Sequence, residues 1–327
     1  MIRFSIMLVA GLAATAALAS DSIWSPVASL PEGLAGSACG VISSRLVLVG
    51  GSRWEDERKI TLREVQSYDP LTNRWEQLDA SPQAFAHGPF CTWRNRILAW
   101  TADSVLTIAM DAPLGRVQAR SLPHPVVYSG STLLHDSFYI LGGCPDALST
   151  SKSTSQFFSM DLVSGSIEIL PEFPGGPAIH IGLAASAGRL WAFTGGVWDK
   201  ASSQMLNTDA AWVYDPLTRK WSSVAPVPYK ARGVAVLALD DRHILLAGGY
   251  RNEDGGAHLT DACLIYDLET NQYHSLGRLP IAVMLASLAR VDDWIYVLGG
   301  ENGPRRRSAN VYRAPLRALL QHEDSRS

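Results

Sequence analysis

Short apolar stretches that end in a pair of glycines recur along the chain. In one of them, the alternating stretch Trp294–Leu298 runs directly into Gly299 and Gly300. Short alternating stretches that stop at turn-forming residues predict β-strands rather than helices. The pairs occupy positions 50–51, 142–143, 195–196, 248–249 and 299–300, and from residue 143 onward they are 53, 53 and 51 residues apart. The interval between residues 51 and 143 is nearly twice as long, so a sixth unit without glycines is expected around residues 96–100.

The units also end alike, with a Tyr-Asp turn and then an aromatic residue. Three units show this ending clearly: Tyr68-Asp69 before Trp75, Tyr214-Asp215 before Trp221, and Tyr266-Asp267 before Tyr273. Together with a small-residue strand and the strand before the glycine pair, this gives four strands in a unit of about fifty residues. Such a unit resembles the kelch repeat of β-propellers. We predict an all-β fold, a six-bladed kelch-type β-propeller.

The last unit lacks its final aromatic strand, since the spacing of the other units would place that strand in the polar tail near residue 324. A matching stretch stands instead at the other end of the chain, at residues 23–28. We therefore predict that the last blade is closed by the N-terminal strand, which removes an open sheet edge. The propeller is expected to span residues 20–316, followed by a polar C-terminal tail at 317–327.

The first nineteen residues resemble a signal peptide. Arg3 supplies a positive charge, residues 4–18 are apolar, and Ala17-Leu18-Ala19 is a small-x-small cleavage site. We predict that residues 1–19 are removed on export, that the protein is periplasmic or secreted, and that no membrane span remains after cleavage.

Composition excludes some classes of function. The net charge is −3 and only 18 % of residues are charged, so the broad basic surface of a nucleic-acid-binding protein is not expected. The four cysteines are too few for a disulfide framework in a chain of 327 residues, and they are expected to be small buried residues. No His/Cys cluster has the spacing of metal ligands, and we predict neither a metal nor a cofactor.

Chemistry is expected at one mouth of the propeller, where the turn before each inner strand and the loop after each glycine pair emerge together. Arginine pairs with carboxylates and aromatic rings stack on sugars, so these segments favour a polar, possibly anionic small ligand. The candidate substrate-binding residues are Arg53, His87, Tyr128, His180, Arg232 and Glu253.

Three segments are similar to the bacterial sialic acid mutarotases (N-acetylneuraminate epimerases), and especially to their cyclically permuted relatives. They are the turn 173–177, the loop with Gly300, Glu301 and Arg307, and the stretch from Pro31 to Gly51. The resemblance implies that a cyclic sugar acid, N-acetylneuraminate or a related sugar, is the small-molecule substrate and that its anomers are interconverted by ring opening. It also implies that Glu301 is the catalytic base and that Arg307 binds the substrate carboxylate or stabilises developing charge, without a cofactor.

Other interpretations remain open. Thr260-Asp261-Ala262 matches the mutarotase loop better than Ser308-Ala309-Asn310, which would move the chemistry to the fifth unit with Glu253 and His258. A non-catalytic propeller that binds a glycan or a protein partner at the same mouth is the main alternative. A copper radical oxidase of the galactose oxidase type is a further alternative, but it requires a crosslinked Cys–Tyr pair that the sequence does not suggest.

Overall fold

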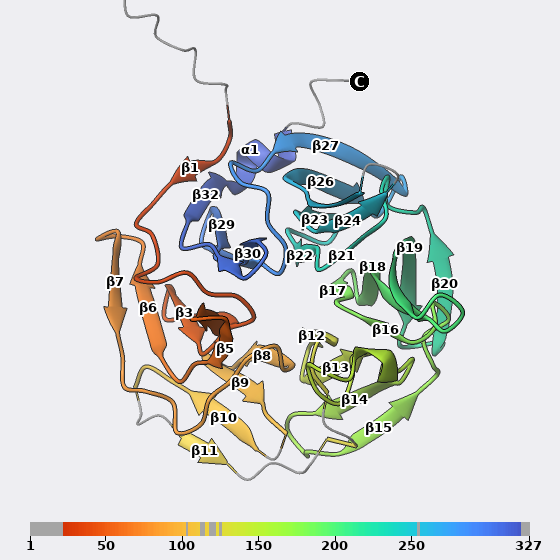
Figure 1. Cartoon of the computed structure of the whole chain (residues 1–327), viewed down its shortest axis with the longest axis horizontal. Coiled ribbons are helices and arrows are strands. Elements are labelled where there is room, and N and C mark those ends of the chain that lie inside the picture. The colour runs from red at the N-terminus through yellow and green to blue at the C-terminus, as the bar shows by residue number, and fades with distance from the viewer. Residues whose placement is uncertain are drawn as a thin grey trace, which may run out of the picture.

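The computed structural model describes residues 22–102, 104–111, 115–117, 122–123, 126–253 and 256–321, without the side chains of 115–117 and 253. Figure 1 shows its sheets arranged in chain order around a central axis. Six strands are innermost, one in each unit, and they contact one another in a closed ring of β2, β8, β12, β17, β22 and β28. The fold is an all-β propeller.

The strands form sheets in sequence order. The first sheet contains β2 (Ala38–Ile42), β3 (Arg45–Val49), β6 (Val65–Asp69) and β7 (Arg74–Gln77). The second contains β8 (Phe90–Trp93), β9 (Arg96–Trp100), β10 (Val105–Ile108) and β11 (Gly115–Val117). The third contains β12 (Gly130–Leu134), β13 (Ser137–Leu141), β14 (Phe157–Asp161) and β15 (Ile167–Leu170). The fourth unit has β17 (Gly182–Ser186), β18 (Arg189–Asp199), β19 (Gln204–Asp215) and β20 (Lys220–Val224). The fifth sheet contains β22 (Ala235–Ala238), β23 (His243–Ala247), β26 (Ala262–Asp267) and β27 (Gln272–Arg278). The last contains β28 (Ser287–Val291), β29 (Trp294–Leu298), β32 (Val311–Pro315) and, from the N-terminus, β1 (Ser25–Pro26).

The glycine pairs join neighbouring units. The N–H of Gly51 donates to the carbonyl of Phe85 in the next unit at 2.7 Å, and the N–H of Gly300 donates to the carbonyl of Leu34 at 2.9 Å. Gly50 has φ +62°, and a Cβ there would lie 2.2 Å from the Phe85 oxygen. A glycine is therefore required both by the backbone angle and by the close approach of the next sheet.

The prediction of six equal four-stranded blades is met only in part. Five four-stranded sheets are separate, whereas β17 to β20 belong to an eight-stranded sheet that also includes β16 (Ala178–Ile179), β21 (Ala231–Arg232), β24 (Tyr250–Glu253) and β25 (Gly256–Leu259). The reason is that β18 does not stop at Gly195 and Gly196. It continues through them, with a register shift between Phe193 and Gly195, into a long hairpin with β19.

Closure by the N-terminal strand is confirmed. Ser25 pairs with Arg313 and Pro26 with Tyr312, so β1 completes the sheet of β28, β29 and β32 (Figure 1). The N–H of Leu30 extends the contact by donating to the carbonyl of Ala309 at 2.8 Å. The two ends of the propeller thus hold each other in one sheet.

The C-terminal boundary differs from the prediction. Residues 317–321, expected to begin a polar tail, belong to helix α1 (Leu316–Gln321). Leu319 on this helix is fully buried in the same apolar cluster as Trp24. The expectation failed because an apolar Leu-Arg-Ala-Leu-Leu segment precedes the polar residues, and its buried face packs on the closing sheet. Within the described residues, no helix is long and apolar enough to cross a membrane.

Candidate functional site

Six equivalent residues, one before each inner strand, form the narrowest part of the ring and are called here the throat. Each has a left-handed backbone, with φ between +53° and +73°: Gly36, His87, Tyr128, His180, Gly233 and Leu285. Backbone hydrogen bonds of 2.7 to 3.0 Å link them in order, with each N–H donating to the carbonyl of the preceding member from His87 to Leu285. Non-glycine residues rarely adopt this conformation, and where they do it is often at a functional site.

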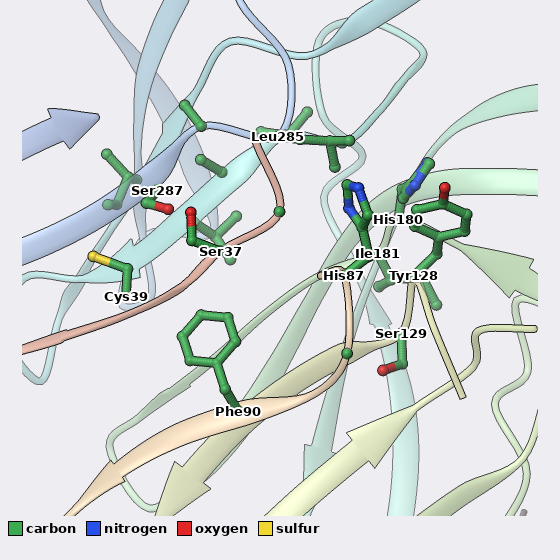
Figure 2. Close-up of a pocket in the computed structure, with 18 residues that line it drawn as sticks. Ser37, Cys39, His87, Phe90, Tyr128, Ser129, His180, Ile181, Leu285 and Ser287 are labelled. Carbon is green, nitrogen blue, oxygen red and sulfur yellow. The ribbon is translucent and has the colours of Figure 1, made fainter. Parts of the chain in front are cut away.

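The left-handed backbone brings three aromatic throat residues together. The rings of His87 and Tyr128 are 4.9 Å apart between centroids, and those of Tyr128 and His180 are 4.3 Å apart in an edge-on arrangement. Figure 2 shows the three side chains grouped on one side of the throat. The sequence analysis predicted that these residues would meet at one mouth, and the structure confirms their location.

Two cavities meet at the throat. The mouth cavity, of about 710 Å³, lies above it, and the throat cavity, of about 210 Å³, lies beside the inner strands; both touch His87, Tyr128, His180 and Leu285. The mouth cavity is also lined by Lys59, Arg232, Tyr250, His258, Glu301 and Asn302, among others. Figure 2 shows the throat cavity, with Ser37, Cys39 and Ser287 across from the aromatic group. The mouth cavity is therefore the one lined by charged side chains, and it is large enough for a small ligand or an inserted side chain.

The two throat histidines are neutral. Burial lowers the pKa of His180 to about 3, assisted by the charges of Arg232 and Lys59. Burial likewise holds the pKa of His87 well below its usual value, with further contributions from Lys59, His180 and Arg307. His87 Nε2 lies 3.2 Å from Ser52 Oγ, whereas neither ring nitrogen of His180 has a hydrogen-bond partner within the described structure. His180 is thus a buried neutral ring with two unpartnered nitrogens, and it lines both cavities.

Lys59 is a cavity residue that the sequence analysis missed. It lies on β5 (Arg58–Thr61), which forms a hairpin with β4 (Ser52–Glu55), and its Nζ donates to Tyr128 Oη at 3.1 Å. Burial lowers the pKa of Lys59, and the charge of Arg307 adds to this, while Glu301 opposes it. The signal that could have revealed it is its position in the segment after the first glycine pair, the same segment that supplied the candidate Arg53. Only the fold shows that this hairpin reaches across to the third unit.

Glu301 and Arg307 form an ion pair. They are paired across the short strands β30 (Glu301–Gly303) and β31 (Arg306–Arg307), and Arg307 Nη1 lies 2.7 Å from Glu301 Oε2. The arginine side chain is only 5 % exposed and does not line the mouth cavity, whereas the glutamate is 27 % exposed and does. The predicted pair is therefore brought together, but the position of Arg307 fits a group that holds Glu301 rather than one that binds a ligand carboxylate.

Arg232 is the arginine that faces the mouth cavity. Its guanidinium stacks on the ring of Tyr250 at 4.3 Å and donates to Asn207 Oδ1 at 2.7 Å. Burial lowers its pKa, although it stays a cation. No described carboxylate lies within ion-pair distance of it. Arg232 can therefore offer its remaining donors to an anionic ligand.

Two other predicted site residues do not fit as expected. Arg53 is wrong as a cavity residue, because it does not line the mouth cavity and is ion-paired with Glu32 at 2.8 Å, Glu55 at 2.7 Å and Glu64 at 3.3 Å. The side chain of Glu253 lies outside the described residues, so its proposed role stays a prediction. His258, which we paired with it in the fifth unit, does line the mouth cavity.

The cysteines are all free and buried. Burial raises the pKa of Cys39 and of Cys91 to about 12, so both are inert thiols. Among the residues that the structure describes, no group of three or more His, Cys, Asp or Glu side chains is arranged to hold a metal ion.

Comparisons with known proteins agree with the geometry of the ring. A family model described as the Kelch motif matches residues 33–79. Kelch-like protein 35 of Mus musculus is 24 % identical over 282 residues, which are 82 % of this chain and 43 % of the relative. Kelch-like protein terF of Aspergillus terreus is 23 % identical over 249 residues, 69 % of this chain and 52 % of the relative. Kelch repeat and BTB domain-containing protein 12 of Danio rerio is 31 % identical over 84 residues, 24 % of this chain and 14 % of the relative.

These similarities support a kelch-repeat β-propeller. The matched region spans about half or less of the length of each of these relatives. None of the three is named as a mutarotase, and they give no support to the resemblance on which a sugar-acid substrate was predicted.

Proposed function

We propose that this protein is an exported, six-bladed kelch propeller that binds a protein partner, and that an acidic segment of the partner inserts into the mouth cavity. The observation that carries the proposal is the charge of that cavity. Lys59 and Arg232 are partly buried cations with no ion-paired carboxylate among the residues that the structure describes, whereas Glu301 is already paired with Arg307. A cavity with unmatched positive charge favours a ligand with carboxylates.

The neighbouring groups support a peptide-like ligand. The rings of His87, Tyr128 and His180 line the cavity beside the two cations and present apolar surface to the inserted segment. The similarity to kelch-like proteins is consistent with a binding role. The predicted signal peptide at residues 1–19 would place this partner outside the cytoplasm.

The first prediction tests the role of Arg232. A panel of peptides rich in Asp or Glu is compared with matched Asn or Gln peptides by fluorescence polarisation. We expect the acidic peptides to bind better, and Arg232→Gln to weaken their binding by about tenfold or more, because a charge-assisted hydrogen bond contributes about 1.5–3 kcal/mol.

Arg94→Gln is the matched control for this experiment. Arg94 also stacks on an aromatic ring, that of Trp93 at 4.4 Å, but it lies in the turn at the opposite end of an inner strand. Equal binding of acidic and amide peptides, or equal losses in the two variants, would contradict the proposal.

A second candidate function is the mutarotase activity that the sequence resemblance implies. One observation favours it: the side chain of Glu301 reaches the mouth cavity and is oriented by its ion pair with Arg307, a position from which a carboxylate can act as a general base. Because Arg307 is paired with Glu301 and does not line the mouth cavity, the arginine available for a sugar carboxylate is Arg232.

This candidate predicts that the protein accelerates the exchange of N-acetylneuraminate anomers, followed by NMR. Glu301→Gln should reduce the acceleration by about 10²–10⁴-fold, the usual contribution of a general base. The control is Glu57→Gln, since Glu57 is paired with Arg305 but is 81 % exposed. Absence of acceleration by the unmodified protein eliminates the mutarotase and leaves the binding proposal standing.

A further inference from the structure

The structure points to a chemical role for Lys59: we propose that its amine forms a reversible imine with an aldehyde or ketone that carries a carboxylate or phosphate group. This chemistry is separate from the binding of a protein partner proposed above. It makes the mouth cavity a site for anionic carbonyl compounds such as 2-oxo acids.

The position of Lys59 distinguishes it from every other lysine in the chain. The sequence contains five lysines, and Lys152, Lys200, Lys220 and Lys230 are all exposed on the surface. Lys59 is partly buried in the wall of the mouth cavity and is held by its hydrogen bond to Tyr128. It is therefore fixed in place but still reachable from the cavity.

The surroundings of Lys59 lower its pKa, so a larger fraction of its amine is neutral, and therefore nucleophilic, than in an exposed lysine. Burial removes water that would stabilise the ammonium ion, and the nearby charge of Arg307 acts in the same direction. Glu301 opposes this effect, but its carboxylate is already shared with Arg307 at 2.7 Å. Lysines that form imines in enzymes are activated by the same two causes, desolvation and a neighbouring cation.

Tyr128 is placed to move the protons of the reaction. In the first step the Lys59 nitrogen attacks the carbonyl carbon, the C–N bond forms as the C=O π bond breaks, and one N–H proton passes to the oxygen. The hydroxyl then takes the phenol proton of Tyr128 and leaves as water while the nitrogen lone pair forms the C=N bond. The resulting phenolate recovers the remaining N–H proton, so Tyr128 is restored. Burial raises the pKa of Tyr128 to about 12, so the phenol holds its proton beforehand.

Arg232 accounts for the anionic group of the ligand. Arg232 and Lys59 line the same cavity, and both are close enough to His180 for their charges to add to burial in lowering its pKa. A carboxylate bound by Arg232 would direct an adjacent carbonyl group toward the amine.

The test uses reductive trapping of the full-length mature protein. Glyoxylate and sodium cyanoborohydride are added at neutral pH, and modification of each lysine is followed by peptide mass spectrometry. We expect Lys59 to be modified several-fold faster than the four exposed lysines, which serve as internal controls. Propanal, a neutral aldehyde, should show a smaller preference for Lys59, and Arg232→Gln should remove the difference between the two aldehydes.

A second variant separates acid catalysis from simple access. Tyr128→Phe keeps the ring but lacks the hydroxyl, so trapping at Lys59 should slow while trapping at the exposed lysines is unchanged. Modification of Lys59 at or below the rate of the exposed lysines in the unmodified protein would overturn the proposal. Because the readout is covalent modification, it is independent of whether acidic peptides bind.

Discussion

At the scale of single residues, the throat shows how a left-handed backbone brings three aromatic side chains together. His87, Tyr128 and His180 occupy a left-handed position where Gly36 and Gly233 stand in other units. A non-glycine residue costs about 1–3 kcal/mol there, and the interblade hydrogen bonds hold it in place. The sequence placed these three residues at the mouth, because each precedes an inner strand. It could not show that their rings touch or that the histidines are neutral, since both depend on packing between units.

A prediction at this scale concerns the pH dependence of stability. His180 has a pKa of about 3 in the folded protein and about 6.5 when unfolded, so below pH 6.5 only the unfolded chain takes up this proton. The free energy of unfolding therefore decreases as the pH falls from about 6.5 toward 3. Between pH 6.5 and pH 5 the loss from His180 is about 2 kcal/mol, and His180→Asn, whose side chain tolerates φ > 0, should lack it.

Urea denaturation at the two pH values measures this difference. His135→Asn is the matched control, because His135 has the same left-handed backbone, with φ +56°, but is exposed. We expect the control to keep the full pH dependence of the unmodified protein. If His180→Asn also keeps it, the histidine is not buried in its neutral form.

At the scale of elements, the regular parts of each repeat were predictable and the irregular parts were not. The strand ends at the glycine pairs could be predicted because the need for glycine is local: the backbone is left-handed and the next sheet approaches closely. The continuation of β18 through Gly195 and Gly196 was not predictable, because the same two letters end a strand in the other units. β18 continues as a hairpin with β19 of the same unit, and β19 in turn pairs with β21, which precedes the inner strand of the next unit.

The same limit explains the mixed outcome at the site. Glu301 and Arg307 lie on one short hairpin, so spacing alone could bring them together. Arg53 and Lys59 also lie on one hairpin, and the sequence favoured the wrong member. Arg53 is surrounded by three glutamates, whereas Lys59 reaches Tyr128 two units further on. Which side of a hairpin faces the axis is decided by the neighbouring units.

At the scale of the whole molecule, the ring is held together by its two ends. The missing strand of the last unit could be counted from the sequence, and the structure supplies it as β1. The pairing itself is short, only Ser25 and Pro26. Backbone hydrogen bonds from Val27 to Val311 at 3.0 Å and from Leu30 to Ala309 at 2.8 Å extend it, and buried side chains pack beside it. Trp24, which is 4 % exposed, packs in a cluster with Leu279, Ile295 and Leu319 from the fifth and last units and the terminal helix.

This arrangement predicts that Trp24 is a main support of the closed ring. Trp24→Ala should lower the free energy of unfolding by about 3–5 kcal/mol, the usual cost of removing a large buried aromatic side chain. Leu71→Ala is the control, since Leu71 is 97 % exposed on a turn and should change stability by no more than about 0.5 kcal/mol. Both are measured by urea denaturation. Because Trp24 ties the N-terminal strand to the core of the fifth and last units, its loss should destabilise the closed ring. Equal stability of the two variants would show that this residue does not support the closure.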